Sequence, residues 1–393
     1  GECPWNPEHQ LVHIGLQGRT IEKENLPPAN LVFLIDVSGS MSSSNKLGLV
    51  KASLEMLVEE LRPEDQVSMV VYAGAAGLVL PPTSGSDKQT IKNAIGRLSA
   101  GGSTAGAQGI QLAYETAQKS FLNEGNNRVI LATDGDFNIG MSSDAELVRL
   151  IEEKRKSGVF LTVLGYGMGN YKDNKMQKLA NKGNGNHAYI DDMFEAKKVL
   201  VDEFGGMFTI AKDVKIQIEF NPRVVEGYRL VGYENRMLNK EDFNDDTKDA
   251  GEIGAGHTVT ALYEIIPSGK ESDFLSTVDE LKYQSFIPKE NSLDETLTIK
   301  LRYKQPAGEK SALIERSLNS AKCVDCSDNY NWAAAVAAYG MVLRDSKYKQ
   351  DADLEMVKSL ARTSKGADSK GLRADFLNLV DISDAYLQKN NFE

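Results

Sequence analysis

The chain has 393 residues, of which 41% are hydrophobic and 26% are charged, and these fractions are typical of a globular protein of two or three domains. They exclude a disordered polymer, a collagen-like repeat and a small disulfide scaffold. The longest apolar run in the N-terminal third covers residues 31–35, whereas a membrane-spanning helix needs about 20 apolar residues. The formal net charge is −11, and no basic stretch offsets it, so nucleic acid is not an expected partner.

The first 29 residues contain one alternating stretch, residues 11–16 (LVHIGL), which predicts a strand. The proline pair at 27–28 then marks a linker, because prolines end regular structure. The sequence starts at Gly1 with neither Met nor a signal peptide, and we expect the native chain to extend upstream.

From residue 30 onward the patterns of strand and helix alternate. Residues 31–35 form a continuous apolar run that ends in Asp36, which is typical of a parallel strand covered on both faces. The alternation predicts a doubly wound, mostly parallel α/β domain over residues 30–206, with ligands at the carboxyl ends of its strands. Further strands are expected at 67–72, 128–133, 159–164 and 187–190, and helices near 47–61, 87–98, 106–122, 143–157, 173–182 and 193–206.

After residue 206 the helical pattern stops, and residues 207–322 predict an antiparallel β domain, sandwich-like in type. An acidic insert at 241–249 is expected to be a solvated hairpin loop, because it lacks the spacing of an EF-hand calcium site. Open sheet edges are costly, so the strand in residues 1–29 is expected to pair with this β domain, which would make the α/β domain an insertion. The expected β segments are 214–220, 224–231, 258–266 and 297–303.

Residues 323–393 are predicted to be helical, with an Ala-rich helix at 331–344 and a final helix that carries apolar residues from 372 to 386. The chain has three cysteines: Cys3, Cys323 and Cys326. The last two form a C-x-x-C, but a zinc site would need a second pair of ligands. A disulfide or plain thiols are favoured over a catalytic role, and the spacing leaves the pairing open.

Oxygen-bearing side chains follow several of the predicted strands. Asp36, Ser38 and Ser40 form a D-x-S-x-S on the loop between a parallel strand and a helix. Mg²⁺ prefers oxygen ligands, and hydroxyls two residues apart can face one ion while the carboxylate balances its charge. Thr104, in the loop GGSTAG, and Asp134, after the strand 128–133, are further candidates. Loops after parallel strands meet at one edge of the sheet, so we expect these oxygens to converge there.

These residues resemble the von Willebrand factor type A domain, in which D-x-S-x-S, a threonine and a later aspartate form a metal-ion-dependent adhesion site. The contexts S-G-S-M at 38–41 and T-D-G at 133–135 strengthen the resemblance. Helix capping would explain the first aspartate and the serines, but neither the threonine nor the second aspartate. The resemblance implies Mg²⁺, with Mn²⁺ or Ca²⁺ as alternatives, bound to a Glu or Asp carboxylate of a protein partner. The implied metal-site residues are Asp36, Ser38, Ser40, Thr104 and Asp134.

Three other segments resemble a bacterial family with a central type A domain and a C-terminal domain of unknown function. They are residues 3–7 (CPWNP), the insert 242–257 and the Ala-rich stretch 333–340. The resemblance implies an exported protein of the bacterial cell envelope, either periplasmic or anchored to a membrane by segments outside this chain.

The resemblance thus predicts a metal-dependent protein-interaction module, and two other functions are alternatives to it. The loop GGSTAG lacks the G-K-[ST] of a phosphate-binding P-loop, and no G-x-S-x-G nucleophile elbow is present. Asp134 and Asp136 would form the carboxylate pair of a metal-dependent phosphoryl-transfer hydrolase, but the resemblance assigns Asp134 to a partner-binding metal, so no enzyme is expected. The other alternative is a structural protein whose metal only stabilises loops. The four histidines, His9, His13, His187 and His257, have no metal-ligand spacing.

Overall fold

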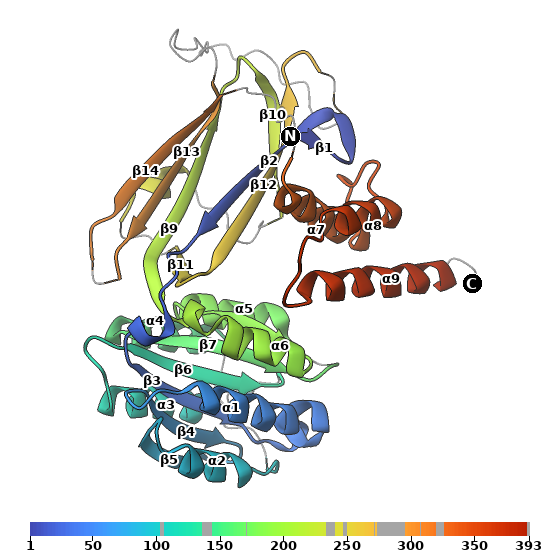
Figure 1. The fold of residues 1–393 in the computed structure, drawn as a ribbon. Coiled ribbons are helices and arrows are strands. Elements are labelled where there is room, and N and C mark those ends of the chain that lie inside the picture. The colour runs from blue at the N-terminus through green and yellow to red at the C-terminus, as the bar shows by residue number, and fades with distance from the viewer. Residues whose placement is uncertain are drawn as a thin grey trace.

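Figure 1 shows the computed structural model, in which an α/β domain lies beside two antiparallel sheets and a group of C-terminal helices. The structure describes residues 1–102, 106–135, 144–169, 171–232, 240–246, 250–270, 272, 295–306, 308–319 and 326–390. Within those ranges, no helix has the length and the hydropathy that crossing a membrane requires.

The α/β domain is built on a six-stranded sheet in the order β5–β4–β3–β6–β7–β8. Every strand is parallel to its neighbours except the edge strand β5 (Ala76–Ser84), which pairs antiparallel with β4. The sequence did not predict β5, because it is mostly exposed and contains a pair of prolines, a composition that only an edge strand tolerates. The other strands are β3 (Ala29–Asp36), β4 (Gln66–Tyr72), β6 (Asn126–Thr133), β7 (Val159–Tyr166) and β8 (His187–Ile190).

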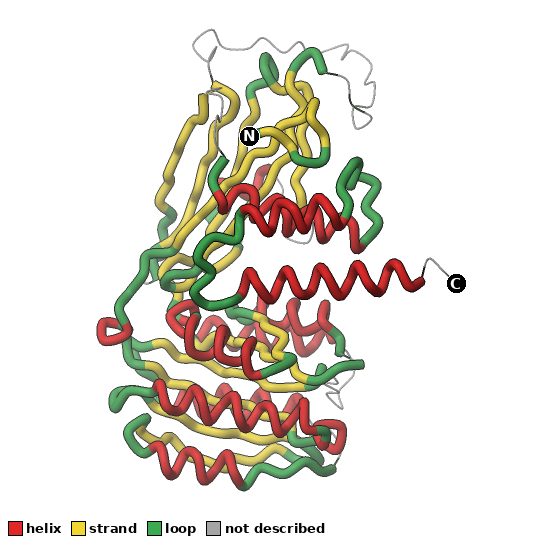
Figure 2. Tube along the Cα trace, turned by 45° about the vertical axis from the view of Figure 1, so that its right-hand side comes forward, coloured by secondary structure: helices red, strands yellow, loops and turns green. Residues whose placement is uncertain are grey.

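Helices cover both faces of this sheet, as Figure 2 shows, and the strand β3 is buried along its whole length. Its Phe33 belongs to one buried core with Val50 of α1, while the next residue, Leu34, belongs to a second core with Ile110 of α3 on the opposite face. The prediction of a doubly wound α/β domain is therefore confirmed. Three helices contribute to the core on the Phe33 side of the sheet: α1 (Leu49–Glu60), α2 (Lys88–Gly96) and α6 (Met193–Lys197). Three others contribute to the core on the Leu34 side: α3 (Gly106–Lys119), α4 (Asp144–Lys154) and α5 (Asp173–Lys182).

The remaining strands form two antiparallel sheets, in the orders β1–β2–β12–β10 and β11–β9–β13–β14. The strand expected near residues 11–16 belongs to β2 (Asn6–Gln17), which pairs with β12 (Thr258–Pro267) along eight residue pairs. The chain thus leaves the β region after β2 and returns at β9 (Thr209–Phe220), with the α/β domain inserted between. The others are β1 (Glu2–Cys3), β10 (Val225–Val231), β11 (Gly251–Gly254), β13 (Glu295–Lys304) and β14 (Ala312–Asn319).

The described part of the acidic insert differs from the expected solvated loop. Lys215, only 2% exposed, donates to the backbone carbonyl of Asp242 at 3.1 Å and also to that of Asp245. Lys304 donates to the carbonyl of Asp246 at 2.8 Å. Two buried ammonium groups therefore hold this segment against the sheet through its carbonyl oxygens, and Lys304 also pairs with Asp213 at 2.7 Å.

Two backbone segments approach closely just before β9, where the chain re-enters the antiparallel sheets. A Cβ on Gly254, in β11, would lie 1.8 Å from the carbonyl oxygen of Gly206, which belongs to a short helix, η6 (Phe204–Met207). Only glycine fits such an approach.

We expect Gly254→Ala to lower the free energy of unfolding by about 2 kcal/mol, because two backbone segments must separate to admit the methyl group. Urea denaturation measures this loss. Gly251→Ala, in the same strand, is the matched control because a Cβ there meets nothing within 4 Å. Equal stability of the two variants would show that the junction yields without cost.

The C-terminal helices α7 (Asp328–Leu343), α8 (Leu354–Thr363) and α9 (Leu372–Asn390) complete the fold, and α9 runs between the α7–α8 pair and the α/β domain (Figure 1). Trp5 and Leu11 of the N-terminal segment share a buried cluster with Ala334 of α7. This segment and the helices therefore share one core, although they lie at opposite ends of the chain.

A buried carboxylate ties the same parts together. Glu264 of β12 is 1% exposed and accepts hydrogen bonds from Trp5 Nε1 at 3.1 Å and Gln350 Nε2 at 2.9 Å. It also pairs with His9 Nδ1 at 2.5 Å and with Arg229. One side chain thus bonds the N-terminal strands, the sheet and the loop between α7 and α8.

Candidate metal centre

Asp36 lies at the carboxyl end of β3 and is fully buried. Its Oδ1 accepts the backbone N–H of Ser38 at 2.9 Å. Its Oδ2 accepts hydroxyl groups from Tyr72 of β4 at 3.1 Å and Thr133 of β6 at 3.2 Å. Burial raises the pKa of Asp36, and the charge of Asp134 adds to the rise, whereas the hydrogen bonds from Ser38 and Tyr72 oppose it. A buried carboxylate in this setting is stabilised by a nearby cation.

The two serines of the motif bring their hydroxyl oxygens together. Ser38 Oγ and Ser40 Oγ are 2.9 Å apart, and Ser38 is 2% exposed. Adjacent oxygens of an octahedral Mg²⁺, each bound at about 2.1 Å, are separated by about 3 Å. The spacing of the two hydroxyls therefore fits neighbouring positions around one such ion.

Asp134 follows β6 and is 6% exposed. The Nζ of Lys46 lies 2.8 Å from its Oδ2 and 3.0 Å from the carbonyl oxygen of Ser40, so one ammonium joins the two loops. Lys46 did not figure among the sequence-predicted residues. The only signal for it is a lysine soon after the D-x-S-x-S loop, where the next helix begins.

Four of the five predicted residues, Asp36, Ser38, Ser40 and Asp134, therefore lie at the same edge of the sheet. Thr104 and Asp136 lie outside the described residues. Gly101 and Gly102, which precede Thr104 in the sequence, are hydrogen-bonded to the loop that carries the D-x-S-x-S motif. Gly39 N donates to the Gly102 carbonyl at 3.1 Å, and Gly101 N donates to the Val37 carbonyl at 2.7 Å.

The donor set consists of carboxylate and hydroxyl oxygens, which suit Mg²⁺, Mn²⁺ or Ca²⁺ rather than softer metals. Over the part of the chain that the structure describes, no group of three or more His, Cys, Asp or Glu side chains forms an alternative metal cluster. The described residues thus fit a hard divalent ion. They offer two neutral hydroxyl oxygens, from Ser38 and Ser40, and two carboxylates, from Asp36 and Asp134.

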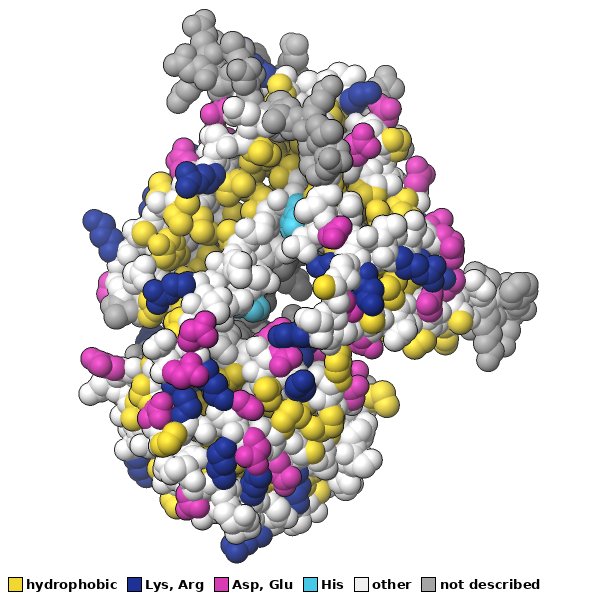
Figure 3. All heavy atoms as spheres, in the orientation of Figure 1, with side chains coloured by type: hydrophobic (Ala, Val, Ile, Leu, Met, Phe, Trp, Pro, Cys, Tyr) yellow, Lys and Arg dark blue, Asp and Glu magenta, His cyan; other side chains and the backbone are white. Residues whose placement is uncertain are grey.

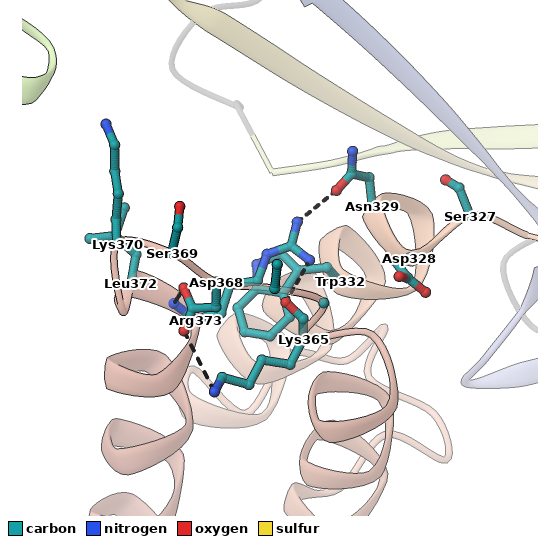
Figure 4. A pocket seen from close by; sticks show the side chains of 12 residues that line it. Ser327, Asp328, Asn329, Trp332, Lys365, Asp368, Ser369, Lys370, Leu372 and Arg373 are labelled. Atoms are coloured by element: carbon teal, nitrogen blue, oxygen red, sulfur yellow. Dashed lines mark hydrogen bonds and ion pairs between the residues drawn. The ribbon is translucent and has the colours of Figure 1, made fainter.

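A large open pocket, about 700 Å³, lies elsewhere, between the start of α7 and the segment that joins α8 to α9 (Figure 4). Arg373 lies 4.8 Å over the ring of Trp332 and donates to Asn329 Oδ1 at 2.6 Å and the Ser364 carbonyl at 2.7 Å. Asp368 accepts the backbone N–H of Arg373 at 3.0 Å. These groups hold the connection between helices, and we assign them a structural role.

Comparison with known proteins gives two family matches. Residues 30–203 match the von Willebrand factor type A domain, and residues 205–385 match the family described as "Uncharacterized protein YfbK, C-terminal". The chain is a bacterial von Willebrand factor type A protein with a YfbK-type C-terminal domain. The predicted family is thus confirmed.

The relative "Uncharacterized protein YfbK" of Escherichia coli (strain K12) is 43% identical over 385 residues, 97% of this chain and 66% of its own length. The chain therefore spans slightly less than two thirds of that protein. The Magnesium-chelatase 60 kDa subunit of Cereibacter sphaeroides is 34% identical over 128 residues, 32% of this chain and 22% of the subunit.

Among solved structures, "von Willebrand factor type A from Catenulispora acidiphila" is similar over 94% of this chain and 88% of its own, with a TM-score of 0.50 and 16% identity. This similarity concerns the fold alone. It extends beyond the type A domain into the antiparallel sheets and the C-terminal helices.

Proposed function

We propose that this chain is a metal-dependent protein-interaction module, in which the type A domain binds a Glu or Asp carboxylate of a partner protein through Mg²⁺. The metal-site residues are Asp36, Ser38, Ser40, Thr104 and Asp134. The observation that carries the proposal is the pair of hydroxyl oxygens 2.9 Å apart, beside two buried carboxylates at the carboxyl edge of the sheet.

Each described residue contributes a distinct part of the chemistry. Hydrogen bonds from three elements fix the orientation of the Asp36 carboxylate, so its oxygens need not reorganise when a cation arrives. Ser38 and Ser40 provide neutral oxygen ligands, so within the described centre only the carboxylates of Asp36 and Asp134 offset the charge of a cation. A divalent ion held there supplies a Lewis-acidic position that accepts an anionic oxygen.

The proposal is of a binding protein, not an enzyme. In the described part of the centre, the two serine hydroxyls bond each other and the lysine is paired with Asp134, an arrangement that we interpret as ion binding and positioning. The Magnesium-chelatase subunit is similar over only 22% of its length, so it does not favour a chelatase activity. A phosphoryl-transfer hydrolase would be supported instead by metal-dependent hydrolysis of a phosphate ester that Asp134→Ala abolishes.

We further propose that the partner is a protein of the bacterial cell envelope, where this chain would be exported. The net charge of −11 disfavours nucleic acid. Lys and Arg side chains are interspersed with Asp and Glu over the α/β domain on the face that Figure 3 shows, so neither sign dominates there.

A comparative pull-down from bacterial envelope extract tests this function. The partner is expected to bind in Mg²⁺, to be released by a chelator, and to be retained largely at raised NaCl, because a direct metal–carboxylate bond is screened less than surface charge. Thr104→Ala should weaken binding without lowering the thermal midpoint. Binding that persists in chelator would show that the partner uses another surface.

A further inference from the structure

Lys46 is built into the candidate metal centre. Its Nζ bonds Asp134 Oδ2 at 2.8 Å and the Ser40 carbonyl at 3.0 Å, and its side chain is only 18% exposed. The stem of the side chain packs on Gly167, where a Cβ would lie 2.5 Å from Lys46 Cε. Glycine at 167, with φ +82°, therefore makes room for the lysine.

The formal charges of the centre show what this lysine changes. Asp36 and Asp134 contribute two negative charges, and a divalent ion cancels them. The loaded centre would then be neutral and would have no electrostatic preference for an anion. The ammonium of Lys46, in direct contact with one of the carboxylates, brings the total to +1.

We propose that Lys46 sets the charge of the loaded centre: it selects a carboxylate ligand, and it weakens the affinity of the ligand-free centre for the divalent ion. Both effects have one cause. A fixed positive charge in a partly desolvated site attracts the incoming anion and opposes the incoming cation. This inference rests on the proposed function and names the residue that determines its ligand class.

A merely structural lysine would tie the Ser40 and Asp134 loops together without altering ligand preference. Lys51 provides the comparison, because it donates to two carbonyl oxygens of the same domain, those of Gly96 at 2.8 Å and Leu98 at 3.0 Å. Lys46→Met removes the charge and keeps most of the packed stem, Lys46→Arg keeps the charge, and Lys51→Met is the matched control.

Two titrations on the full chain measure the two effects. Free Mn²⁺ is followed by electron paramagnetic resonance, and binding of ¹³C-acetate to the Mn²⁺-loaded protein is followed by the broadening of its resonance. Lys46→Met is expected to bind Mn²⁺ about tenfold more tightly than the wild type and, once loaded, to bind acetate about tenfold more weakly. Lys46→Arg and Lys51→Met should stay within about twofold of the wild type in both titrations.

Thermal midpoints confirm that each variant is folded. Unchanged or weaker Mn²⁺ binding by Lys46→Met overturns the proposal. Equal acetate binding by loaded wild type and Lys46→Met also overturns it, while the proposed function survives. If acetate binds neither loaded protein, carboxylate selection and the proposed function fail together.

Discussion

Replacing Asp36 by Asn is expected to abolish detectable Mg²⁺ binding while the protein still folds. The change removes one of the two carboxylates of the centre and keeps the shape of the side chain. An amide can still accept from Ser38 N, and the hydroxyls of Tyr72 and Thr133 can each act as acceptor in place of donor. Isothermal titration calorimetry with Mg²⁺ measures the loss. Asp87→Asn, at the N-cap of α2, is the control and should bind as the wild type does.

The same variant has an expected signature in stability. Burial raises the pKa of Asp36, so the folded state holds this proton more tightly than the unfolded state does. The stabilisation is complete below the ordinary pKa of 3.8 and is lost as pH rises through the raised value. At neutral pH without metal, Asp36→Asn should therefore be more stable than the wild type, with a flatter pH dependence. A loss of stability as large as that of a core deletion would show that Asp36 is structural.

Replacing Glu264 by Ala is expected to lower the free energy of unfolding by about 3–5 kcal/mol, because it leaves the cation of Arg229 without its buried carboxylate partner. The change also removes the acceptor of Trp5 and Gln350. Urea denaturation followed by tryptophan fluorescence suits this measurement. The chain has two tryptophans: Trp5 donates to Glu264 itself, and Trp332 lies in α7 against Phe376 of α9.

Glu8→Ala is the matched control, because Glu8 is an exposed glutamate in β2 that pairs with Lys270. An exposed pair of this kind contributes little to stability. Similar midpoints for Glu264→Ala and Glu8→Ala would show that the buried network is dispensable.

The parts of the fold that the sequence reveals are those whose burial leaves a pattern. β3 contains a continuous apolar run over residues 31–35, and β7 is largely apolar, because both faces of the sheet are covered. β14 was not predicted, since every one of its residues is exposed and burial imposes no alternation on it. α8 was also missed, although Asp353 caps it and its buried residues 354, 357 and 361 follow helical spacing. In that case the signal is present in the sequence.

The residues of the candidate metal centre also fall into two groups: those that the sequence predicts and one that it does not. Asp36, Ser38 and Ser40 belong to one short motif. Asp134 is predicted to lie beside them because it also follows a parallel strand. Lys46 could not be assigned from spacing, because its contact with Asp134 depends on how the motif loop turns and on the room left at Gly167. A long flexible side chain gives no directional signal until its surroundings are placed.

The insertion of the α/β domain between β2 and β9 has a mechanical consequence. The chain enters at the amino end of β3, and Asn126, at the amino end of β6, donates to the carbonyl of Met207 near the exit. Both covalent tethers are therefore anchored at the edge opposite to Asp36. If a partner were bound at the candidate metal centre, a force pulling on it would be transmitted along β3. This strand pairs over seven positions with β4 and over seven with β6. Such a load would shear both hydrogen-bond ladders at once instead of opening them bond by bond.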